Sequence, residues 1–158
     1  MRVKKFLHQL FPAEFFKSPV YARAIVLGIV YLGTLLLQLF TFEKFADVTR
    51  DFNLPGGNVT AVALTWILPL LAAAALPYLI SMKLSPVSYK ISRAAVLLTP
   101  TVWLFLGAWQ NIAAKDAYDT GIFGATIVTP VGIWIIVFAL LWLWASVLCV
   151  RELPQRKK

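Results

Sequence analysis

Four long apolar segments, separated by short polar stretches, limit what this chain can fold into more than any other feature. A hydrocarbon core of about 30 Å is crossed by about 20 apolar residues in a helix. The segments are long enough for this, and the first, Ala24 to Phe42, contains no formal charge. We place the spans at about 24–42, 59–80, 94–114 and 124–150. The pattern predicts an all-α, polytopic membrane protein, folded as a four-transmembrane-helix bundle.

The composition agrees with lipid as the solvent. Hydrophobic residues make up 60% of the chain and charged residues 14%, whereas soluble domains average about 45–50% and about 25%. The length suits one membrane domain over residues 1–158. Within it, residues 1–20 carry Arg2, Lys4 and Lys5 opposite apolar side chains. This segment is expected to form a short amphipathic helix in the headgroup region.

The distribution of charge predicts the orientation in the membrane. In the four-span arrangement, 12 of the 15 basic residues fall in the amino-terminal segment, the loop near residue 83 and the carboxy-terminal tail. Basic residues collect on the cytoplasmic side of membrane proteins. We therefore expect a multi-pass protein of the cell membrane with both termini in the cytoplasm. The net charge of +8 is then explained by the basic residues on the cytoplasmic side. No nucleic-acid partner is expected.

The polar stretch after the first span has helical periodicity. Glu43, Asp47 and Asp51 recur every four residues and share one face, whereas Phe45 and Val48 fall on the opposite, apolar face. We expect a short amphipathic helix at the membrane surface. Lys44 is expected to pair with Asp47, three residues on, or with Asp116 from the only other loop on this side.

The candidate site is an outer rim, which is the set of polar side chains expected at the non-cytoplasmic mouth of the bundle. Its members are Gln38, Glu43, Lys44, Asp47, Gln110, Asn111 and Asp116. Ionisable groups at membrane depth often mark a pocket for a ligand or partner. The alternative is that the charges lie in water at the span ends and that Gln38 makes a helix–helix hydrogen bond.

No catalytic or metal-binding residues are assigned. The chain lacks nucleotide-loop, zinc-site and nucleophile-elbow motifs. One cysteine, Cys149, and one histidine, His8, offer neither an intrachain disulfide nor a His/Cys metal site. The residues therefore favour a protein that is not an enzyme, and they point to no particular cofactor.

The segment Phe-Glu-Lys-Phe-Ala-Asp at 42–47, followed by Leu54-Pro55, resembles the DoxX/MauE-like four-span membrane proteins. The likeness covers roughly residues 20–150 and implies a link to thiol or quinone chemistry. The chain departs from that family because the second span has no glutamate and there is no cysteine pair. Two hypotheses stay open. One is a non-catalytic membrane subunit that binds another membrane protein or a second copy; the other is a small-solute or quinone-binding membrane protein linked to redox metabolism.

Overall fold

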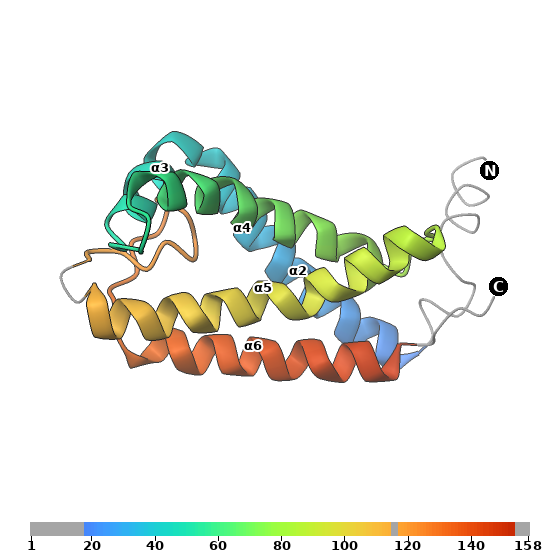
Figure 1. Cartoon of the computed structure of the whole chain (residues 1–158). Coiled ribbons are helices and arrows are strands. Elements are labelled where there is room, and N and C mark those ends of the chain that lie inside the picture. Colours follow the sequence, from blue (N-terminus) through green and yellow to red (C-terminus); the bar gives the residue numbers. More distant parts are fainter. Residues whose placement is uncertain (1–17, 115–116, 154–158) are drawn as a thin grey trace.

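The protein is described by a computed structural model that covers residues 18–114 and 117–153. These residues form five helices: α2 (Pro19–Phe40), α3 (Phe42–Arg50), α4 (Asn58–Leu79), α5 (Pro86–Ala113) and α6 (Ile133–Glu152). The four long helices are long and apolar enough to cross a membrane. The all-α, four-span architecture expected of a multi-pass membrane protein is confirmed (Figure 1). The amphipathic helix expected over 1–20 lies outside the described residues, apart from its last three positions.

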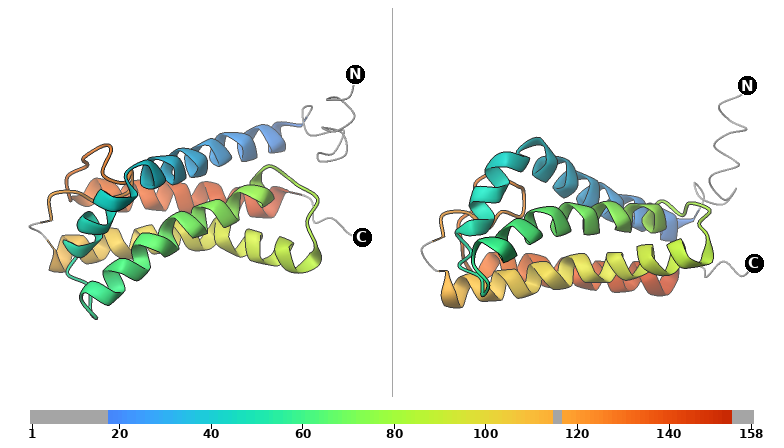
Figure 2. Two further views of the ribbon diagram at one scale, coloured as in Figure 1. Left: turned by 90° about the horizontal axis from the view of Figure 1, so that it is seen from above. Right: turned by 45° about the horizontal axis from the view of Figure 1, so that its top comes forward.

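Successive long helices run in opposite directions (Figures 1 and 2). The start of α2, the connection from α4 to α5 and the end of α6 therefore meet at one end of the bundle, here called the terminal end. Helix α3 and the connection before α6 lie at the opposite end, here called the α3 end. This arrangement brings polar segments that are far apart in the sequence to the same end of the molecule.

The long helices pack in the order α2, α4, α5, α6 around the bundle, and α2 touches α6 less than the other neighbours touch each other. The pairing of α5 with α6 is close, because a Cβ on Gly107 would lie 3.1 Å from Ile135. Small residues allow such approach between membrane helices. The core contains Tyr31, Trp103 and Ile135, all essentially inaccessible.

Two helix starts differ from the expected span limits. Helix α5 begins at Pro86, well before Ala94, because Ser85 accepts a hydrogen bond from the Ser88 backbone N–H at 3.2 Å and caps the helix. Lys90 and Arg93, expected in a loop, are consequently helical. Helix α6 begins only at Ile133, so residues 124–132 belong to a loop and not to the fourth span.

Helix α4 contains two prolines within its length, Pro69 and Pro77. Beside Pro77, the Ser92 hydroxyl of α5 accepts a hydrogen bond from the Tyr78 backbone N–H at 3.0 Å and donates one to the Ala74 carbonyl at 2.5 Å. Those two backbone groups are partners in a regular helix. The Ser92 hydroxyl thus contacts two backbone groups of α4 that would bond to each other in a regular helix, and it links α4 to α5.

Candidate functional site

The α3 end is covered by residues 117–132, here called the cap loop, which is drawn in orange in Figure 1. The loop closes on itself through Asp119, whose Oδ1 accepts hydrogen bonds from the Gly121 N–H at 3.1 Å, the Thr129 N–H at 2.9 Å and the Thr129 hydroxyl at 3.0 Å. The Thr120 N–H also donates to the Thr129 carbonyl at 2.8 Å. The side chain of Asp119 therefore fixes the shape of the loop.

The two glutamines expected in the outer rim hold the cap loop to the helices. Gln38 of α2 donates from Nε2 to the Ile122 carbonyl at 3.1 Å, and Gln110 of α5 donates to the Thr120 carbonyl at 3.2 Å. Their exposed fractions are only 1% and 0%. Non-helical backbone is tolerated near membrane depth only where its polar groups find partners in the protein. Gln38 and Gln110 supply two of these partners.

The cap loop also fits closely against the end of α2. The Ala125 N–H donates to the Thr41 hydroxyl at 2.9 Å, and the Thr126 hydroxyl donates to the Leu37 carbonyl at 3.3 Å. Gly124 has a φ of +63°, and a Cβ there would lie 2.6 Å from the Leu37 carbonyl oxygen. Only glycine meets both conditions without strain.

Asn111, another expected rim residue, also binds backbone. Its Nδ2 donates to the Gly107 carbonyl at 2.7 Å and to the Gly132 carbonyl at 3.1 Å, which connects α5 to the start of α6. Gln38, Gln110 and Asn111 are thus brought to one end of the bundle, as the outer rim required. Each of them, however, is used to hold a loop in place.

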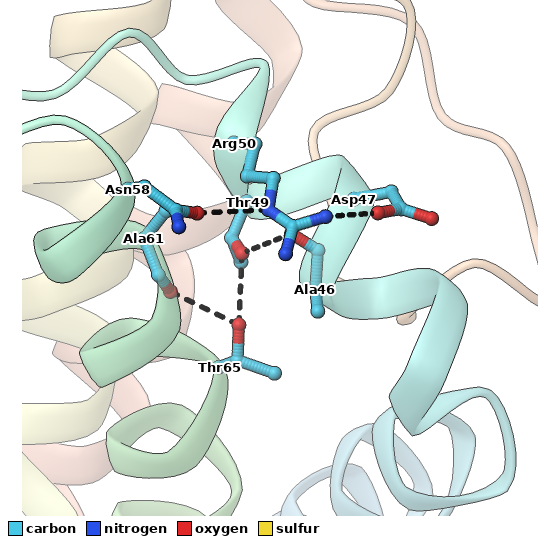
Figure 3. A network of polar contacts seen from close by, with 7 residues as sticks. All are labelled: Ala46, Asp47, Thr49, Arg50, Asn58, Ala61 and Thr65. Atoms are coloured by element: carbon cyan, nitrogen blue, oxygen red, sulfur yellow. Dashed lines mark hydrogen bonds and ion pairs between the residues drawn. The ribbon is translucent and has the colours of Figure 1, made fainter.

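The charged rim residues are not brought together with these amides. Glu43, Lys44 and Asp47 are exposed on α3. The expected Lys44–Asp47 pair is wrong: Asp47 Oδ1 pairs with Arg50 Nη1 at 2.6 Å, and Arg50 Nε also donates to Asn58 Oδ1 at 2.9 Å (Figure 3). The longer, forked guanidinium reaches both acceptors at once. Within the described residues Lys44 makes no ion pair, and Asp116 lies outside them.

Beneath this surface, α3 is attached to α4 by buried contacts. The Thr49 and Thr65 hydroxyl oxygens lie 2.8 Å apart and share a hydrogen bond (Figure 3). Phe45 of α3 and Phe52, which follows it, are also fully buried. The amphipathic helix expected after the first span is therefore present, and its apolar face packs onto the bundle.

A second candidate site lies in the terminal half of the bundle, between α2 and α6. It is an apolar groove of about 790 Å³. Its lining residues come from α2 and from α6: Ala22, Arg23, Val26, Leu27, Val30, Phe138, Leu141, Trp142, Trp144, Ala145, Leu148 and Cys149. The groove was missed from the sequence because apolar residues on two distant helices look like any other lipid-facing surface.

Arg23 is the only charged residue among the described residues that line the groove. Its Nη1 contacts both carboxylate oxygens of Glu152 at 2.9 Å. Glu152 is the one acidic residue that the described part of the chain has at the terminal end, against five basic residues: Arg23, Lys83, Lys90, Arg93 and Arg151. The mouth of the groove therefore opens into a region of net positive charge.

Comparisons of the chain with protein-family models, curated proteins and solved structures find no match. The DoxX/MauE-like resemblance of residues 42–55 remains a prediction from the sequence. The site must be interpreted from its own geometry.

Proposed function

We propose that this integral membrane protein is a binding protein without catalytic activity, and that it holds a lipid-soluble anionic molecule between α2 and α6. The ligand has a long apolar tail and a carboxylate or phosphate head. The observation that carries the proposal is the apolar groove of about 790 Å³, in which Arg23 is the one charged side chain contributed by the described part of the chain.

The size of the groove supports a small molecule. Binding pockets for such molecules measure about 300–1,000 Å³ and are mostly apolar, and the groove, at about 790 Å³, lies in that range. A membrane-spanning helix about 10 Å wide and 30 Å long fills roughly 2,400 Å³. An extended hydrocarbon tail matches the available volume, whereas a complete helix of a partner protein exceeds it.

The charge at the mouth supports an anionic head. Glu152 offsets Arg23, but Lys83, Lys90, Arg93 and Arg151 leave the terminal end positive among the described residues. Basic sites between membrane helices on the cytoplasmic side bind anionic lipid heads. The proposal therefore includes the predicted orientation, with both termini in the cytoplasm. The quinone expected from the DoxX-like resemblance shares the apolar tail but has a neutral head.

The test is native mass spectrometry of the protein purified in a mild detergent, followed by identification of any bound molecule. Val26 and Ile29 are matched positions on α2, with exposed fractions of 64% and 63%, but only Val26 lines the groove. We expect an anionic amphiphile on the parent and on Ile29→Trp, and its loss from Val26→Trp. Fatty acid and phospholipid are distinguished by their masses. An empty parent, a bound quinone, or equal retention by both variants would overturn the proposal.

A second candidate function is the non-catalytic subunit that binds another membrane protein or a second copy through the outer rim. It is supported by Glu43 and Lys44, which are exposed at the α3 end and have no ion-pair partner within the described residues. Reversing both charges, with Glu43→Lys and Lys44→Glu, should abolish co-purification of such a partner. Unchanged co-purification would show that the charges of the outer rim do not bind the partner.

A further inference from the structure

Three buried acceptor oxygens, in the cap loop or on the side chains that bind it, receive no hydrogen bond: Gln38 Oε1, Gln110 Oε1 and Asp119 Oδ2. The three side chains are at least 95% buried. Buried acceptors are almost always paired in native proteins, and an exception calls for a physical explanation such as water or an ion. Their occurrence at one place in the fold is the starting point for a site.

The loop brings these three residues together. Gln110 is bonded to the Thr120 carbonyl, Gln38 is bonded to the Ile122 carbonyl, and Asp119 precedes Thr120 in the chain. All three are therefore anchored within positions 119–122. Gln38 and Gln110 reach this segment from different helices, so the cap loop lies between α2 and α5 at the mouth of the bundle.

Within the described residues, the charge of Asp119 is not compensated by an ion pair. No basic side chain in the described part of the chain pairs with it. Its Oδ1 already accepts three hydrogen bonds, whereas Oδ2 accepts none. A buried carboxylate is costly unless it is paired or coordinates a metal. A cation beside Oδ2 would supply the missing charge.

We propose that Asp119, Gln38 and Gln110 bind one alkali cation, Na⁺ or K⁺, beneath the cap loop. The donors are all oxygens, from one carboxylate and two amides, and such a set favours hard cations over transition metals. One negative charge matches a monovalent ion better than Ca²⁺, whose sites usually contain several carboxylates. This site is separate from the α2–α6 groove, so either proposal can fail without the other.

The bound ion would stabilise the folded protein in proportion to its concentration. We would measure thermal unfolding of the detergent-purified protein in NaCl, KCl, CaCl₂ and choline chloride at constant ionic strength. At about one hundred times the dissociation constant, an alkali ion is expected to raise Tm by roughly 5–10 °C over choline. The same Tm in choline as in both alkali salts would overturn the proposal. So would stabilisation by Ca²⁺ alone.

Variants localise the effect. Asp119→Asn removes the charge and should abolish the alkali dependence, whereas Asp51→Asn, at an exposed acid of the same end, should keep it. Gln110→Met removes one of the proposed oxygen ligands and should weaken the dependence of Tm on alkali ions. This second variant keeps the test valid if Asp119→Asn does not fold. Equilibrium dialysis with radioactive Na⁺ should give one ion per parent chain. An alkali dependence that persists in both site variants would contradict the assignment.

Discussion

The two ends of the bundle are built in different ways. At the α3 end, the non-helical residues 119–122 are buried, and the side chains of Gln38, Gln110 and Thr41 bind the backbone of Ile122, Thr120 and Ala125. In the terminal half, an apolar groove lies between α2 and α6, and Arg23 is the one charged side chain among the described residues that line it. Buried backbone needs hydrogen-bond partners, whereas an apolar groove can be filled by a hydrocarbon chain. The polar end is consequently the closed one.

This difference changes how polar residues in the spans are interpreted. Gln38, Gln110 and Asn111 were candidate ligand contacts because polar groups at membrane depth are costly. All three donate hydrogen bonds to the backbone of a loop. These bonds offset much of the free-energy cost of burying the amide groups. The groove, which has the volume for a ligand, is lined by none of these three residues.

The largest expected effect comes from breaking the closed end with Gly124→Ala. The new Cβ would meet the Leu37 carbonyl, and alanine is strained at the φ of +63°. We expect a loss of about 3 kcal/mol in the free energy of unfolding, measured by SDS titration. Gly33→Ala is the control, because no atom lies within 4 Å of its Cβ. Equal stability of the two variants would show that the cap loop is not packed against α2.

A smaller loss is expected from Gln110→Leu. The change leaves the Thr120 carbonyl without its donor and removes an amide that is fully buried. An unpaired buried acceptor costs about 1–3 kcal/mol. Ile112→Leu, at an exposed position of the same helix, should unfold like the parent. If Gln110→Leu were as stable as the parent, the polar contacts would not be what closes this end.

The smallest effect is expected from the charged surface of α3. Asp47→Asn breaks an exposed ion pair with Arg50, and such pairs contribute about 0–1 kcal/mol. Lys44→Gln removes a charge that has no ion-pair partner within the described residues and should change stability even less. The same SDS titration measures both. A loss above about 3 kcal/mol for Lys44→Gln would indicate a buried pair and return Lys44 to the candidate site.

The sequence was sufficient for the features that depend on local composition. Four apolar segments predicted four helices, and the spacing of Phe45 from Glu43 and Asp47 predicted α3. The cap loop could not be predicted, because residues 124–132 carry no charge and run directly into the fourth apolar segment. The placement of the loop depends on Gln38 and Gln110, which come from other helices. The groove depends on how α2 and α6, which are far apart in the sequence, lie against each other, and no local sequence pattern predicts this.

The central claim, that an anionic amphiphile lies between α2 and α6, is tested most directly by photo-crosslinking in membranes. A fatty acid with a diazirine in its tail would be added, activated by light, and its attachment sites mapped by mass spectrometry. We predict saturable adducts on groove residues such as Val26, Leu141 and Leu148, reduced in Arg23→Gln and blocked by excess unlabelled fatty acid. Adducts spread evenly over exposed residues outside the groove, such as Leu70 and Phe105, would contradict the account.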